Sequence, residues 1–130
     1  MLSDAFTSAV ESWDRDALAA ALAEDVVFRS PVVFKPYEGR EATLAVLEAV
    51  SQVFEDFSYL DRVEGDSTAA LIFRARVGDR ELEGLDHLSF DAEGRITQLR
   101  VMVRPMSGMN ALAEAMRRRL EELGAAPKAG

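Results

Sequence analysis

The sequence predicts a single α+β domain, and three observations lead to that prediction. Apolar residues recur at helical spacing in the N-terminal part of the chain, they alternate with a period of two over residues 57–104, and helical spacing returns after residue 108. The length of 130 residues fits one domain. We expect that domain to span residues 1–123 and to be followed by a flexible tail at residues 124–130.

Four segments carry apolar residues three or four positions apart, which is the spacing of one helix face. In the first segment Phe6, Val10 and Trp13 share a face, and Asp14 is placed to cap the start of the second. Gly124 follows the last segment, as expected for a residue just after a helix end. Helices are therefore predicted over residues 4–13, 15–23, 40–55 and 108–123.

The remaining segments alternate apolar and polar residues, as strands do. A short strand is expected at residues 25–30, where Pro31 limits its extension and begins a loop over residues 31–39. Short turns containing glycine separate the later segments, which predicts an antiparallel meander. Its four strands are expected at residues 57–64, 68–77, 81–91 and 95–104.

Composition and charge exclude several classes of function. Lys and Arg number 15 against 23 Asp and Glu, so the net charge is −8, which argues against nucleic acid as a partner. There is no cysteine and one histidine, so we expect no metal site and no cofactor. The chain has no apolar run long enough to span a membrane and no leader-like N-terminus, so we expect a cytoplasmic protein.

Asp86 is the strongest anomaly of the sequence. Alternation in its strand places it on the same face as Leu82, Leu88 and Phe90, in the middle of an apolar row. A buried carboxyl group must find a partner or keep its proton, and such groups gather at functional sites. Two interpretations stay open: Asp86 is an acid or base in a pocket, or it bonds the protein's own groups at a bulge or a sheet edge.

The opposite face of the same strands mixes apolar residues with charges of both signs. Such a face suits either a solvated sheet surface or a symmetric interface, where Arg and Met are common. We expect the second, a homodimer that pairs through the outer sheet face near Ile72, Arg74, Arg76, His87, Arg100 and Met102.

Several strings of residues resemble the nuclear-transport-factor-2-like superfamily, and within it the SnoaL-like polyketide cyclases and ketosteroid-isomerase-like proteins. They run from Leu22 to Pro31 (LAEDVVFRSP), from Tyr37 to Glu41 (YEGRE) and from Asp86 to Ile96 (DHLSFDAEGRI). The resemblance covers about residues 4–123. It implies a cone-shaped fold, in which a curved antiparallel sheet with a mixed edge is wrapped by three N-terminal helices, with an additional C-terminal helix. It also implies frequent homodimers.

The resemblance carries expectations for a site. The isomerase branch uses a carboxylate base, a tyrosine and a protonated aspartic acid, and Asp86 matches the last of these. Ser30 stands at the position of the base and Phe6 at that of the tyrosine. In the epoxide-hydrolase branch an arginine stands where this chain has Gly84, so that reaction is not expected. The cyclase branch needs little more than an apolar cavity and one acid or base.

The resulting hypothesis is a pocket protein, in which Asp86 is the catalytic acid or base acting on an apolar carbonyl compound. Ser30 and Tyr37 are expected to be its polar contacts. The alternative is a non-catalytic ligand-binding or dimeric assembly module of the same fold. The apolar walls of the pocket are expected to include Trp13, Phe28, Phe54, Phe73, Leu88, Val101 and Val103.

Overall fold

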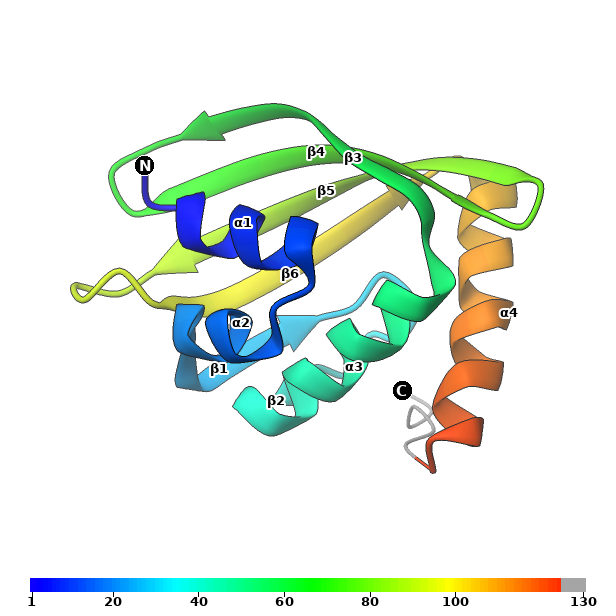
Figure 1. Cartoon of the computed structure of the whole chain (residues 1–130), viewed down its shortest axis with the longest axis horizontal. Helices are drawn as coiled ribbons and strands as arrows, with labels where there is room; N and C mark the ends of the chain where they lie inside the picture. Colours follow the sequence, from blue (N-terminus) through cyan, green and yellow to red (C-terminus); the bar gives the residue numbers. More distant parts are fainter. Residues whose placement is uncertain (125–130) are drawn as a thin grey trace.

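The computed structural model describes residues 1–124 and has the expected α+β architecture, with helices packed on one face of a curved sheet (Figure 1). Three helices form the N-terminal layer and a fourth closes one end of the sheet. The helices are α1 (Asp4–Ser12), α2 (Arg15–Ala21), α3 (Arg40–Val53) and α4 (Met106–Glu122). The strands are β1 (Leu22–Arg29), β2 (Tyr37–Glu38), β3 (Glu55–Glu64), β4 (Thr68–Val77), β5 (Arg80–Phe90) and β6 (Ile96–Arg104).

The sheet has six strands in the order β2-β1-β6-β5-β4-β3. Strands β3 to β6 form the predicted antiparallel meander. The mixed edge arises because β1 pairs with β6 in parallel, with Phe28 opposite Leu99, while β2 pairs antiparallel with β1. Figure 1 shows the long strands bending over α1, α2 and α3. This is the cone-like arrangement that the resemblance implies.

The predicted boundary between the second helix and the first strand was wrong. The helix ends at Ala21 instead of residue 23, and the strand begins at Leu22 instead of residue 25. Leu22 has extended backbone angles and pairs with Ile96 of β6, so a tertiary pairing overrides the helical spacing of Leu18 and Leu22. The cap was predicted correctly: the Asp14 side chain accepts a hydrogen bond of 3.1 Å from the backbone N–H of Ala17.

The segment predicted as a loop at residues 31–39 contains the short strand β2. Gly39 follows it with φ of 95°, a backbone conformation that favours glycine, and begins α3. Its backbone N–H donates to the Val26 carbonyl at 2.8 Å, which fastens the start of α3 to β1. The loop reverses direction, so two of its residues pair with β1. A stretch of two residues is too short for alternation to reveal such a pairing.

Smaller boundary shifts occur elsewhere. Helix α3 ends at Val53 instead of residue 55, and β3 begins at once, at Glu55 instead of residue 57. A register shift in β3 between Glu55 and Ser58, with Asp56 at φ of 54°, explains why alternation broke there. Helix α4 covers residues 106–122 instead of 108–123. Of the tail predicted to be flexible, residues 125–130 lie outside the described residues.

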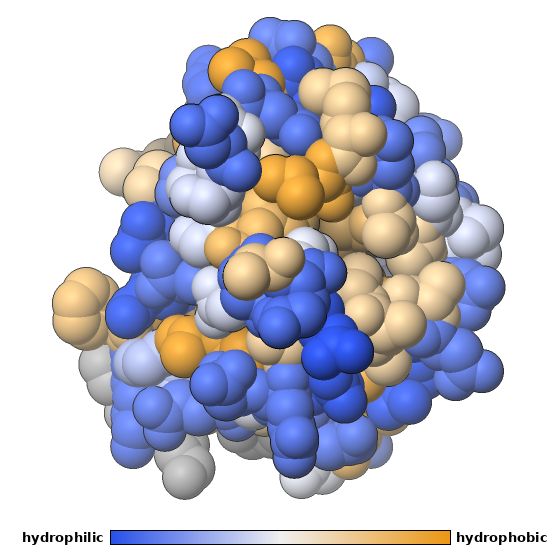
Figure 2. All heavy atoms as spheres, turned by 90° about the vertical axis from the view of Figure 1, so that its left-hand side faces the viewer, coloured by the Kyte–Doolittle hydropathy of each residue, from blue (hydrophilic) through white to orange (hydrophobic). Residues whose placement is uncertain are grey.

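The inner face of the sheet and the facing sides of the helices form one core. It includes fully buried residues from distant parts of the chain, such as Leu18, Leu71 and Leu99. Hydrophilic side chains cover most of the end that lies at the left of Figure 1, and hydrophobic residues reach its surface near the centre (Figure 2). Within the described part of the chain, no helix is long and apolar enough to cross a membrane.

Helix α1 is anchored to β3 at its N-terminal end. The hydroxyl and backbone N–H of Ser3, which is fully buried, both donate to the carboxylate of Glu64. Arg62 adds an ion pair to Asp4 at 2.6 Å. These contacts hold the pKa of Glu64 below its usual value: burial opposes the shift, and hydrogen bonds from Ser3 outweigh it. The anchor places the apolar side of α1 against the inner face of the sheet.

Candidate functional site

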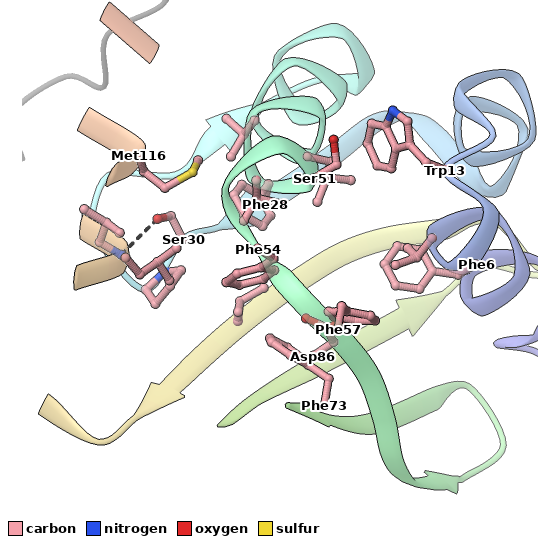
Figure 3. Close-up of a pocket in the computed structure, with 18 of the residues that line it drawn as sticks. Phe6, Trp13, Phe28, Ser30, Ser51, Phe54, Phe57, Phe73, Asp86 and Met116 are labelled. Atoms are coloured by element: carbon pink, nitrogen blue, oxygen red, sulfur yellow. Dashed lines mark hydrogen bonds between the residues drawn. The ribbon is translucent and has the colours of Figure 1, made fainter. Parts of the chain in front are cut away.

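A cavity of about 420 Å³ lies between the N-terminal helices, α4 and the inner face of the sheet. Figure 3 shows Phe6 and Trp13 on one side of it and Ser30 and Met116 on the other. The volume is in the range of small-molecule sites. Most of the lining is apolar, and the carboxyl and hydroxyl groups among the lining side chains are those of Glu11, Ser30, Ser51 and Asp86.

Asp86 occupies the middle of the sheet wall of this cavity. It lies on β5 between Leu71 of β4 and Val101 of β6. The residue is 8% exposed, and its carboxyl group has no hydrogen bond or ion pair with any residue that the structure describes. Burial therefore raises the pKa of Asp86 from 3.8 to about 7. At neutral pH this carboxyl group is present in both its protonated and its ionised form.

The two serine hydroxyls of the cavity are engaged with nearby backbone. Ser51 donates to the Glu48 carbonyl at 2.6 Å, within α3. Ser30 accepts a hydrogen bond of 2.9 Å from the backbone N–H of Val32, drawn as the dashed line in Figure 3. Ser30 therefore borders the cavity, as the sequence suggested, and also stabilises the turn that follows β1. Among residues 1–124 it has no carboxylate partner that would make its hydroxyl a base.

Aromatic side chains cover the sheet wall next to Asp86. Phe57 stacks on Phe73 with ring centroids 5.1 Å apart, and Phe54 lies 5.7 Å from Phe73 and 6.1 Å from Phe57. Figure 3 shows Phe57 and Phe73 directly beside Asp86. This cluster keeps water away from the carboxyl group on one side, which is the physical origin of its raised pKa.

Six of the predicted wall and contact residues lie together around this cavity with Asp86, and three do not. Tyr37 is displaced to a second hollow of about 320 Å³, which Ser30 also borders. It packs there against Phe28 with ring centroids 5.9 Å apart, because β2 carries it to the far side of β1. Leu88 is fully buried and Val103 is half-buried; both belong to the core packing and do not line the cavity. The predicted residues that line it are Trp13, Phe28, Ser30, Phe54, Phe73 and Val101.

Sequence reasoning missed two polar groups near Asp86. Glu11 is an exposed carboxylate at the α1 side of the cavity. Tyr59 does not line the cavity, and its hydroxyl is completely buried and without a hydrogen-bond partner among residues 1–124. Burial, and then the negative charge of Asp86, raise the pKa of Tyr59. Phe57 and Tyr59 are two residues apart in one strand and so share a face. Alternation could therefore have indicated that Tyr59 faces inward.

Potential metal ligands do not gather in the described region. No group of three or more His, Asp or Glu side chains there lies close enough to hold a metal ion.

A family model for the SnoaL-like domain matches residues 3–99. The chain belongs to the SnoaL-like domain family. That match covers most of the chain, including α1, the Ser30 segment and Asp86. Among curated proteins, no sequence matches this one.

Solved structures also support the membership of this protein in the SnoaL-like family. A steroid delta-isomerase from Pseudomonas aeruginosa is 44% identical, with a TM-score of 0.88 over 93% of this chain and 90% of that one. An uncharacterized protein with a cystatin-like fold from Silicibacter pomeroyi is 32% identical, with a TM-score of 0.85 over 91% and 86%. An NTF2-like protein of unknown function from Mesorhizobium loti shares the fold at 19% identity, with a TM-score of 0.71 over 80% and 88%.

Proposed function

We propose that this SnoaL-like protein binds an apolar carbonyl compound of about steroid size and that Asp86 exchanges a proton with it. The observation that carries the proposal is the carboxyl group of Asp86, which is buried, unpaired among the described residues and in the wall of an apolar cavity of about 420 Å³. The printed name of the Pseudomonas aeruginosa relative, a steroid delta-isomerase, supports the choice of ligand class.

The proposed reaction is the migration of a carbon–carbon double bond into conjugation with a carbonyl group. The ionised Asp86 takes a proton from the carbon next to the carbonyl, which leaves a dienolate and a neutral carboxylic acid. The same acid then returns the proton to the far end of the dienolate, so no atom is gained or lost. A pKa of about 7 suits both halves, because proton exchange is most effective when the pKa of the group is near the working pH.

The cavity offers this reaction fewer polar groups than the isomerase branch has. Phe6 provides no hydroxyl, and the hydroxyl of Ser30 accepts from the backbone of Val32. This observation favours the second candidate, a non-catalytic module in which Asp86 holds a ligand by a hydrogen bond. The two candidates differ in whether the ligand is changed, so one variant series separates them.

The test uses a β,γ-unsaturated 3-ketosteroid, with a fused-ring phenol as a non-reacting probe. Conjugation of the double bond raises the ultraviolet absorbance of the product, which gives a continuous assay. We expect binding to raise the unfolding midpoint by mass action, and Asp86→Asn to reduce kcat by about 10²–10⁴-fold. Glu93→Gln, which alters an exposed carboxylate in the turn between β5 and β6, is the matched control.

The possible outcomes separate the enzyme from the non-catalytic module. Turnover that Asp86→Asn abolishes and Glu93→Gln preserves supports the enzyme. Binding of the phenol without turnover of the ketosteroid supports the non-catalytic module. Turnover that survives Asp86→Asn would mean that another group carries the proton, and the proposed role of Asp86 would then be wrong.

We also propose that the protein pairs with a second copy of itself through the outer face of the sheet. Ile72 of β4, Leu85 of β5 and Met102 of β6 are register neighbours and form an apolar row across three strands. Ile72 is 38% exposed and Met102 is 55% exposed. Ion pairs flank the row, between Arg74 and Glu81 and between Arg104 and Glu83. A face with both signs around an apolar centre is complementary to itself under a twofold rotation.

A further inference from the structure

The hydroxyl group of Tyr59 is buried near the cavity, and the proposed reaction does not use it. It has no exposed surface and no hydrogen-bond partner among residues 1–124. Buried hydroxyl groups are nearly always paired in folded proteins, and each exception calls for an explanation. A hydrogen bond that forms in one state of the site and is absent in another would explain why the Tyr59 hydroxyl is unpaired here.

The sheet register places Tyr59 and Asp86 on the two strands that flank β4, on the same face of the sheet and offset by two residues. Tyr59 of β3 is opposite Phe73 of β4, and Leu71, two residues earlier on β4, is opposite Asp86 of β5. The ring of Tyr59 meets that of Phe57 edge to face, with centroids 5.0 Å apart. Since Phe57 lines the cavity beside Asp86 and Tyr59 does not, the tyrosine can act on the site through Asp86 and not by touching a ligand.

The charges around Tyr59 keep it a hydrogen-bond donor. Burial is the main cause that raises the pKa of its phenol, and the negative charges of Asp86 on β5 and Glu11 on α1 raise it further. Arg62 on β3 opposes the shift, but its guanidinium is engaged with Asp4 and Ser3. A phenol with so high a pKa stays protonated over the whole pH range in which Asp86 titrates.

We infer that Tyr59 is a positioning residue, whose hydroxyl donates a hydrogen bond to the carboxylate of Asp86 once that group has lost its proton. The link forms by a turn of the Asp86 side chain, because the Tyr59 hydroxyl has no exposed surface for a water to reach. The neutral acid gains less from this bond than the ion does, because hydrogen bonds to charged acceptors are the stronger ones. Tyr59 therefore favours the ionised form of Asp86, which is the form that removes a proton from a substrate.

This inference deepens the proposed function, on which its catalytic meaning rests, but it is tested on the protein without a ligand. The pH titration of the Asp86 side-chain carbon is followed by ¹³C NMR in the full chain and in Tyr59→Phe. We expect the variant to raise the midpoint by about one pH unit, because the ion loses its donor. Tyr37→Phe is the matched control: this is the chain's other tyrosine, it borders the second hollow, and its change should leave the midpoint in place.

A second measurement needs no variant of Tyr59. The ring carbon that bears its hydroxyl should change chemical shift with the same midpoint as Asp86 in the unaltered protein, and this transition should vanish in Asp86→Asn. The inference is overturned if the Asp86 midpoint is the same in Tyr59→Phe as in the unaltered protein. It is also overturned if the chemical shift of the Tyr59 carbon does not change with that midpoint. Failure of the proposed function looks different, since the Tyr59 carbon would then still follow the titration of Asp86 in a protein that turns over no ketosteroid.

Discussion

The ring of Phe73 lies directly over the backbone of Gly84, on the neighbouring strand. A Cβ atom added at Gly84 would be 2.0 Å from Cζ of Phe73 and 2.4 Å from Cε2. The two residues are register partners between β4 and β5, so the absent side chain makes the room that the ring fills. This contact sets the depth of the cavity wall beside Asp86, two residues further along β5.

Gly84→Ala should therefore disturb the aromatic cluster. The ring of Phe73 is 2% exposed and packs against Phe54 and Phe57, so it has little space to move aside. We expect a loss of about 1–3 kcal/mol in the free energy of unfolding, typical of overpacking, and weaker binding of a cavity ligand. Urea unfolding measures the first and a thermal-shift titration the second.

Gly65→Ala is the control for that substitution. A Cβ there would meet the Thr68 hydroxyl at 3.3 Å, which is a close contact but not an overlap. If the two alanine variants lose equal stability, the Phe73 contact is not the cause. Adding Phe73→Leu to Gly84→Ala removes the overlapping ring atoms, so the double variant should lose less stability than the sum of the single changes.

Asp86→Asn should change stability in a way that depends on pH. The pKa of Asp86 in the folded protein is about 7, above the value of 3.8 expected when unfolded. Below about pH 4 both states hold the proton and no penalty arises; between pH 4 and 7 the unfolded state ionises first, so stability falls as pH rises. Above pH 7 the penalty is complete, with an upper limit of about 4 kcal/mol.

The measurement compares urea unfolding of the two proteins at pH 4.5 and pH 8. We expect the variant to gain stability over the parent protein at pH 8 and to gain much less at pH 4.5. Asp86→Leu, which also lacks the ionisable group, should show the same trend with pH. An equal difference at both pH values would contradict the assigned titration of Asp86.

Ser30→Ala should affect the loop and leave any chemistry nearly intact. The Ser30 hydroxyl accepts a hydrogen bond from the backbone N–H of Val32. Val32 is partly exposed, so a water molecule can replace the hydroxyl as the acceptor. We expect a loss of about 0.5–1.5 kcal/mol in the free energy of unfolding and less than a twofold change in kcat. A loss of turnover comparable to that of Asp86→Asn would show instead that Ser30 acts on the substrate.

The proposed homodimer predicts a mass in solution of twice 14.3 kDa. Ile72→Lys with Met102→Lys places two charges in the apolar row of the outer face and should shift light-scattering mass to that of one chain. Phe34→Lys is the control, because Phe34 is 90% exposed but lies in the loop after β1. A single-chain mass for the unaltered protein at all accessible concentrations rules the dimer out.

The regular parts of this protein could be predicted from residue spacing, because alternation and helical spacing report burial directly. Asp86 stood out for that reason, since a carboxyl group on an apolar face breaks the pattern. Tyr37 could not be placed, because its position depends on β1 doubling back to form β2, which is a tertiary pairing of two residues. Tyr59 was missed for another reason: an inward tyrosine is ordinary in a strand, and its unpaired hydroxyl exists only in three dimensions.

The parallel pairing of β1 with β6 has a consequence for synthesis of the protein. Phe28 cannot meet Leu99 until some seventy residues of intervening chain have been made, and the cavity wall also needs Met116 of α4. Helices α1 to α3 are synthesised first, and their apolar sides stay exposed until the later strands of the sheet have been made. We therefore expect fragments that stop before β6 to aggregate or be degraded, and ligand binding to begin only after α4 has been synthesised.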